Sequence, residues 1–231
     1  MPLQKAVSEG EQNRALGLST FAFTICFAVW TIFAIIGIEI KTELGLNETQ
    51  FGLLVGTPIL TGSLVRLFLG VWTDQYGGRI VFPLTMLASA AATWLLSYAD
   101  SYGLLLLAAL GLGLAGGGFA VGVAYVSKWY PQQKQGAALG FFGMGNVGAA
   151  VTKFVAPWVM VALGWTAVAQ IWAAVLAVVA VLFFVFAKDD PDLAARKLSG
   201  EKPMGLMAQL EPLKSEQVWR FSLYYFFVFG A

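Results

Sequence analysis

The 231-residue chain is 58% hydrophobic and only 12% charged, a balance that favours the bilayer over water as the solvent around its surface. Its formal net charge of +1 excludes the strong excess of Lys and Arg that nucleic-acid binding requires. With no histidine and with Cys26 as its single cysteine, the chain lacks an internal disulfide and the usual metal and general-base side chains. We therefore expect no metal, no cofactor and no enzymatic activity.

Six segments have the length and apolar character of membrane-spanning helices, which need about 20 mostly apolar residues. We predict spans at residues 17–40, 51–72, 80–99, 102–127, 136–163 and 165–187. The predicted domains are a six-helix bundle at 1–187, a polar cytoplasmic loop at 188–217 that contains three prolines, and the start of a seventh helix at 218–231. Because that last segment is too short to cross a bilayer, we expect the chain to continue into a second half.

Basic residues gather on one side of the predicted bundle, as they do in short cytoplasmic loops. That side holds Lys5, Arg14, Arg79, Lys128, Lys134, Lys188, Arg196, Lys197, Lys202, Lys214 and Arg220. The opposite loops hold only Lys41. The pattern predicts a cytoplasmic N-terminus and leaves Arg66 and Lys153 as the basic residues inside predicted spans.

Arg66 lies in the second span, six residues before the predicted end at Trp72. A charged side chain near the bilayer centre costs from about 2.5 to more than 10 kcal/mol, so it usually faces a wet cavity or a partner. All Asp and Glu residues fall in loops, tails or at span ends, with Glu39 and Asp74 closest to the membrane. An unpaired guanidinium is a fork of donors that fits a planar oxyanion. We predict anion binding at Arg66, with snorkelling or pairing with the second half as alternatives.

The fourth and fifth spans are rich in glycine, at Gly111, Gly113, Gly116, Gly117, Gly118, Gly122, Gly136, Gly140, Gly143, Gly145 and Gly148. Small residues let helix backbones approach closely, so tight packing accounts for most of them.

Asn146 is an amide inside an apolar span and needs hydrogen-bond partners, either at a helix contact or in a polar cavity. Lys153 follows seven residues later, two turns along nearly the same helix face. It would add positive potential on the outer side of Asn146 if that face lines a pathway. A lysine whose long stem reaches the opposite interface is the alternative.

The turn between spans two and three runs from Gly70 to Arg79, with Asp74 and Gly77 between them. Its charges can latch neighbouring helices and bias an open–closed equilibrium, although an exposed ion pair is typically worth less than about 1 kcal/mol. A solvated turn is the alternative.

That turn resembles the Gly-x-x-x-Asp-x-x-Gly-x-Arg loop motif of the major facilitator superfamily. Residues 116–120, 127–136 and 143–148 are more specific, since they resemble the signature of the nitrate/nitrite porter family. The resemblance covers the whole chain. It implies an all-α integral membrane protein: the N-terminal six-helix half of a twelve-helix fold, plus the start of helix 7, in a bacterial cytoplasmic membrane.

The resemblance also implies site residues. The motif Gly62-x-x-x-Arg66 places the first of two anion-binding arginines at Arg66, and the second falls in the other half. Matching motifs place aromatic walls and polar groups at Phe27, Phe119, Asn146, Tyr225 and Phe229. Gly70, Asp74, Gly77, Arg79, Gly143, Gly145 and Gly148 have structural or gating roles, and Lys153 is a candidate for coupling.

The leading hypothesis is alternating-access transport of nitrate or nitrite, in which the anion neutralises two arginines and lets the halves close. The absence of a mid-membrane Asp, Glu or His favours nitrate/nitrite exchange, whereas Lys153 and its surroundings resemble the proton-linked type. We expect proton symport, with antiport as the alternative. A non-transporting oxyanion sensor is the competing class, and a channel would need a ring of like charges that one arginine does not make.

Overall fold

The computed structural model describes residues 7–200 and 206–230, without the side chains of residues 206, 207, 225, 226 and 228–230. The chain divides after Ala195 into two compact units. The first unit consists of α1 Glu9–Trp30, α2 Phe33–Glu43, α3 Glu48–Tyr76, α4 Gly78–Leu96, α5 Tyr102–Leu112, η1 Gly113–Gly117, α6 Gly118–Ser127, α7 Gln132–Gly143, η2 Met144–Val147, α8 Gly148–Leu163, α9 Trp165–Phe186 and the beginning of α10.

The second unit holds the rest of α10 Pro191–Ser199, then α11 Leu206–Gln209, η3 Glu211–Lys214 and α12 Glu216–Gly230. The polar stretch 188–217, which the prolines suggested to be a loop, therefore contains short helices. Within this unit, the indole of Trp219 donates to the carbonyl of Leu213 at 2.7 Å and ties the start of α12 to η3.

Six helical segments of the described chain are long and apolar enough to cross a membrane, as predicted: 9–43, 48–76, 78–96, 102–127, 132–163 and 165–186. The protein is a multi-pass membrane protein. Several helices extend beyond the predicted spans because polar residues can continue a helix past the apolar stretch that composition detects. Asn47 and Gln50 form a capping box that begins α3 at Glu48, ahead of the predicted start at residue 51.

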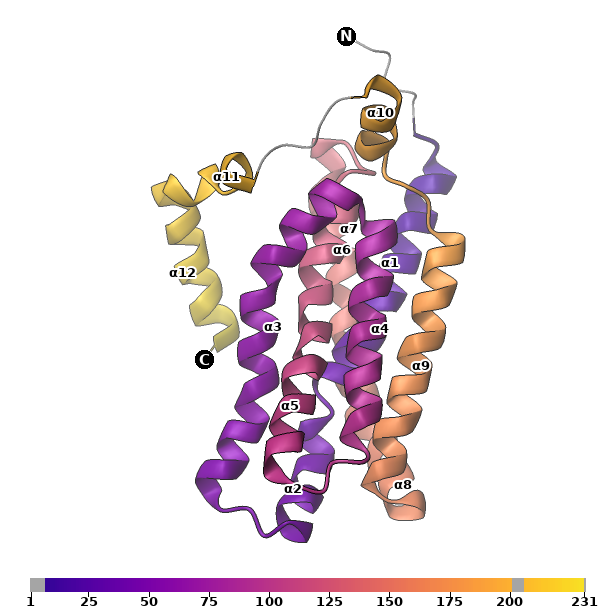
Figure 1. The fold of residues 1–231 in the computed structure, drawn as a ribbon. Helices are drawn as coiled ribbons and strands as arrows, with labels where there is room; N and C mark the ends of the chain where they lie inside the picture. Colours follow the sequence, from indigo (N-terminus) through magenta and orange to yellow (C-terminus); the bar gives the residue numbers. More distant parts are fainter. Residues whose placement is uncertain (1–6, 201–205, 231) are drawn as a thin grey trace. The chain divides into compact units, whose positions relative to one another are not determined.

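The six crossings run alternately up and down the first unit (Figure 1). We call the end with the start of α1 and the α3–α4 and α6–α7 turns the N-side, and the opposite end the far side. Single glycines make two of the tightest turns: Gly77, between α3 and α4, has a φ of 86°, and Gly164, between α8 and α9, has a φ of 85°. Glycine adopts this left-handed region without the steric cost that a side chain brings.

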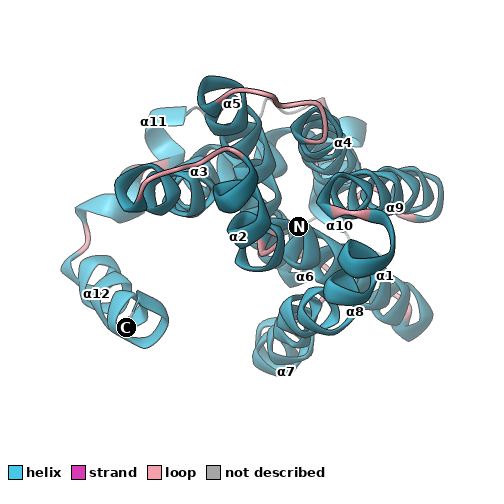
Figure 2. Ribbon diagram, turned by 90° about the horizontal axis from the view of Figure 1, so that it is seen from below, coloured by secondary structure: helices cyan, strands magenta, loops and turns pink. Residues whose placement is uncertain are grey.

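Close backbone approach holds the bundle together. Helix α4 packs on α9 and α5, α3 packs on η1 and α6, and α1 packs on α9, η2 and α8; Figure 2 shows these helices end-on. A Cβ on Gly148 would overlap the carbonyl oxygen of Thr24, and a Cβ on Gly113 would lie 2.9 Å from the carbonyl oxygen of Pro58. The expected tight packing is therefore present at most of the glycines. Gly136, Gly140 and Gly143 differ, since no described atom lies within 4 Å of a Cβ placed there.

Candidate functional site

Arg66 lies deeper along its helix than the sequence suggested. Helix α3 continues to Tyr76 rather than ending at Trp72. Arg66 is therefore ten residues from the N-side end of α3, or about 15 Å at 1.5 Å per residue. The polar residues after Trp72 lie beyond the apolar stretch, so the longer helix does not change the depth of Arg66 in that stretch, and snorkelling stays an alternative.

The guanidinium of Arg66 has aromatic and backbone partners. Its Nε donates to the carbonyl oxygen of Gly116 at 3.3 Å. Its Cζ lies 5.8 Å from the ring centroid of Trp30 and 5.7 Å from that of Phe119, both within the range of cation–π attraction. Among the described residues, no carboxylate forms an ion pair with Arg66. Its positive charge is held in place without being neutralised.

Five aromatic rings continue from Arg66 into the bundle. Phe119 lies 5.4 Å from Phe23 and 5.8 Å from Phe142, measured between ring centroids. Phe27 joins the same group, at 5.6 Å from Phe23 and 5.3 Å from Trp30. The structure thus brings together Arg66, Phe119 and Phe27, three of the predicted site residues, in one group with an aromatic wall beside the cation.

Asn146 and Lys153 are placed on a different segment. The amide nitrogen of Asn146 donates to the carbonyl of Gly143 at 2.8 Å, and the residue is exposed in η2. Lys153 is exposed on α8 and forms no ion pair with any described carboxylate. Asn146 is linked to Arg66 indirectly, because its partner Gly143 follows Phe142, whose ring lies beside that of Phe119. The functional roles of Asn146 and Lys153 stay predictions.

Three of the six spans are interrupted inside their apolar stretch. The breaks lie at Thr31–Ile32 between α1 and α2, at η1 and at η2. Short 3₁₀ segments within a longer helix often mark hinges. At each break a polar side chain donates to a nearby carbonyl: Thr31 to Phe27 at 2.9 Å, Arg66 to Gly116 at 3.3 Å, and Asn146 to Gly143 at 2.8 Å. Two of the predicted site residues therefore bond to the backbone at these breaks.

The predicted loop motif lies at the N-side and joins several helices. Asp74 at the end of α3 pairs with Lys128 at the end of α6 at 2.9 Å. Arg79 at the start of α4 pairs with Asp189 after α9 at 3.9 Å. Gly77 makes the turn and is covered by Leu193, whereas Gly70 has no described atom within 4 Å of a Cβ position. The charges of the motif contact other helices, and their gating role stays a prediction.

The remaining predicted residues fall into two groups. Gly145 packs against Phe23, and Gly148 packs against the backbone of Thr24, so both bring α1 and the η2–α8 segment together. Tyr225 and Phe229 belong to α12, but their side chains lie outside the described part of the chain.

Sequence reasoning missed Trp30, Phe23 and Phe142. A signal was present in part, because Phe23, Phe27 and Trp30 are spaced by four and three residues and share one face of α1. Nothing in the local pattern shows that this face meets Arg66, since the contact depends on how α1 packs against α3.

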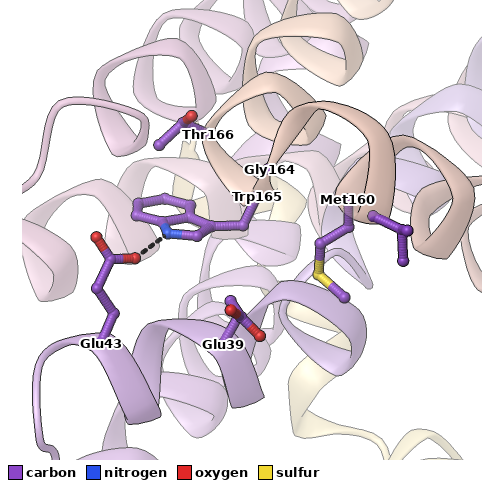
Figure 3. A pocket seen from close by; sticks show the side chains of 7 residues that line it. Glu39, Glu43, Met160, Gly164, Trp165 and Thr166 are labelled. Carbon is purple, nitrogen blue, oxygen red and sulfur yellow. Dashed lines mark hydrogen bonds between the residues drawn. The ribbon is translucent and has the colours of Figure 1, made fainter.

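A cavity of about 530 Å³ lies on the far side, between the end of α2 and the α8–α9 turn. The indole Nε1 of Trp165 donates to Glu43 Oε2 at 2.5 Å, and Glu39 lies on the same wall (Figure 3). Two carboxylates repel an anion, so this cavity does not suit the anion that is predicted to bind at Arg66.

Relatives with assigned names resemble this chain along nearly its whole length. The probable nitrate/nitrite antiporter NarK1 of Thermus thermophilus is 41% identical over 244 residues, covering 100% of this chain and 53% of the relative. The nitrite extrusion protein of Bacillus subtilis is 31% identical and covers 95% and 54%, respectively. The probable nitrate transporter NarT of Staphylococcus aureus is 32% identical and covers 91% and 52%. The chain spans about half the length of these relatives.

A solved structure shows the same fold. The bacterial homolog of the human lysosomal transporter Spinster, in an inward-facing and unoccupied conformation, superposes with a TM-score of 0.69 at 21% identity, covering 80% of this chain and 44% of that chain. The family model of the Major Facilitator Superfamily matches residues 18–231, which is most of the chain. With six spans and this match, the chain belongs to the Major Facilitator Superfamily.

Proposed function

We propose that this chain is half of a secondary transporter that moves nitrate or nitrite across the membrane by alternating access. The observation that carries the proposal is Arg66, a cation well inside a span that has aromatic and carbonyl partners but no carboxylate partner among the described residues. A charge of this kind is costly unless a ligand or a water-filled cavity compensates it. The names of the relatives supply the oxyanion class.

The geometry suits a small planar anion. With Nε bonded to Gly116, the two Nη groups of Arg66 form the end of the guanidinium that can meet two oxygens at once. The rings of Trp30 and Phe119 cover the guanidinium and lower the local dielectric, which strengthens its attraction for an anion. We propose that a second half, as in the relatives of twice the length, supplies another arginine and closes the site.

Alternating access needs segments that bend and contacts that break. The breaks at Thr31–Ile32, η1 and η2 are the proposed bending points, because backbone there already departs from the α-helix. The Asp74–Lys128 and Arg79–Asp189 pairs are the proposed N-side latch, since ion pairs present in one state bias the equilibrium toward it. We place the N-side in the cytoplasm of a bacterial cell, and we propose no enzymatic step.

Two forms of coupling are proposed. The surroundings of Lys153, which resemble the proton-linked type, support proton symport. Exchange of nitrate for nitrite is the second candidate, because the chain has no histidine and the Thermus relative is named an antiporter.

The test is uptake into sealed proteoliposomes by the protein assembled with its second half, at matched membrane potential. We expect saturable nitrate uptake that Arg66→Ala abolishes and Arg66→Lys weakens, because lysine keeps the charge but lacks the planar fork. Arg14→Ala, an exposed arginine on α1, is the matched control and should transport normally. Normal uptake by Arg66→Ala would disprove the assigned role.

The same vesicles separate the coupling modes. Acceleration by an inward proton gradient without internal nitrite indicates symport, and dependence on internal nitrite indicates exchange. Oxyanion binding without uptake in either condition would favour the sensor hypothesis instead.

A further inference from the structure

Trp30 is the last residue of α1, directly before the break at Thr31–Ile32. It is half-buried, and its indole Nε1 donates to the carbonyl oxygen of Pro58 on α3 at 2.9 Å. This bond joins two spans inside their apolar stretch. It also sets the in-plane orientation of the indole ring, because the N–H has one direction and one acceptor.

The ring follows one face of α3. Pro58, Gly62 and Arg66 are spaced by four residues, so they lie one above another on that face. The indole bonds to Pro58 at one end, passes over Gly62, and faces the guanidinium of Arg66, whose Cζ is 5.8 Å from the ring centroid. A Cβ on Gly62 would lie 3.0 Å from the indole Nε1, so glycine is what leaves room for the ring.

Helix η1 also packs against the indole. A Cβ on Gly116 would lie 2.7 Å from Nε1 and from Cε2 of Trp30. The carbonyl oxygen of the same Gly116 accepts the hydrogen bond that Nε of Arg66 donates. The indole and the guanidinium therefore share one slot between α3 and η1. Gly62 and Gly116 determine the width of this slot.

We propose that Trp30 is a positioning residue of the anion site, which orients the plane of the Arg66 guanidinium so that its Nη groups face the substrate. The proposal rests on the proposed function of Arg66. Arginine has many rotamers, and a site that needs two parallel N–H···O bonds must restrict them. Trp30 restricts the Arg66 rotamers through contact with its ring, and the hydrogen bond from Trp30 to Pro58 holds the ring in position beside the guanidinium.

The first experiment measures KM and maximal rate for nitrate uptake by Trp30→Phe and Trp30→Leu in the protein assembled with its second half. Trp30→Leu removes the ring and should raise KM by about tenfold, the size expected when a desolvated cation–π contact is lost. Trp30→Phe keeps an aromatic face but loses the bond to Pro58, so a smaller rise of a few-fold is expected. Trp94→Phe, on an exposed part of α4, is the matched control and should leave KM unchanged.

A double-mutant cycle separates positioning from simple packing. In the Arg66→Lys protein no planar group remains to be oriented, so adding Trp30→Phe should change KM little further. A merely structural Trp30 would instead lower the thermal stability and act additively in both backgrounds.

The outcomes are distinct. If Arg66→Ala abolishes uptake while both Trp30 variants keep the normal KM, the positioning role is wrong and the proposed function stands. If Arg66→Ala transports normally, the proposed function fails first and the role of Trp30 fails with it. If Trp30→Leu does not fold, the KM and thermal stability of Trp30→Phe still decide between positioning and packing.

Discussion

On the N-side of the bundle, Lys128, Arg79 and Lys188 each lie within 4.0 Å of a carboxylate, whereas Arg66 inside the second span has two aromatic faces and one carbonyl oxygen. These three cations form ion pairs with carboxylates of the same chain. Arg66 is oriented but not neutralised within the described residues. The difference teaches that this bundle places charge in two ways: paired charges join helices where water is near, and an unpaired positive charge lies at the proposed anion site.

The largest effect is expected from giving Arg66 the kind of partner that the N-side cations have. Ser63 is exposed on α3, three residues before Arg66, and Ser63→Asp would place a carboxylate within reach of the guanidinium. The pair would neutralise the field that attracts the substrate, so saturable uptake should disappear. Uptake kinetics measure this. Ser63→Asn is the control, because Asn has the size of Asp without its charge and should retain transport.

The next effect concerns the slot that holds Arg66 and Trp30. Gly116→Ala would put a Cβ 2.7 Å from the indole, and overpacking of this kind costs about 1–3 kcal/mol. A lower thermal unfolding temperature in detergent and a raised KM are the expected results. Gly103→Ala, at a position on α5 with no described atom within 4 Å of a Cβ, should be neutral. Equal behaviour of the two variants would show that the slot is not tight.

A smaller effect is expected at the N-side. Asp74→Asn removes the ion pair with Lys128, whose side chain is 14% exposed while that of Asp74 is 50% exposed. Because the pair is partly screened by water, its loss should cost about 1 kcal/mol or less. Because the N-side latch is weakened, the equilibrium should shift toward the state in which the N-side is open. We expect the maximal rate to change a few-fold while KM stays nearly unchanged. A large rise in KM would contradict the separation of latch from binding site.

The smallest effect is expected on the far side. Trp165→Phe removes the bond to Glu43, which is exposed to water, and should cost about 1 kcal/mol or less of stability. Nitrate KM should stay normal because the proposed anion site lies at Arg66 and not in this acidic cavity. A change in KM would show that the far-side carboxylates act on the substrate path.

Much of the architecture could be predicted from the sequence because membrane spans are long and apolar. The number of spans and Arg66 as an unusual charge inside one of them follow from composition along the chain. The length of α3 beyond Trp72 could not be predicted this way, since Thr73, Asp74 and Gln75 are polar residues that nevertheless continue the helix.

The glycines show the same limit. Those of the fourth span and those of α7 have similar spacing, yet Gly113 and Gly116 are tightly packed while Gly136 and Gly140 are open in the described bundle. Spacing tells which residues share a helix face, but not which neighbour that face meets.

The sequence by itself determined the membrane class, the six spans and the presence of a cation inside the second span, because each depends on the solvent that a residue would meet along one helix. Only the tertiary structure decided that Trp30 of α1 packs against both Gly62 of α3 and Gly116 of η1 and faces Arg66. These contacts join residues up to 86 positions apart, from 30 to 116. They arise from helix packing, and the local sequence of a helix does not show which other helix its face will contact.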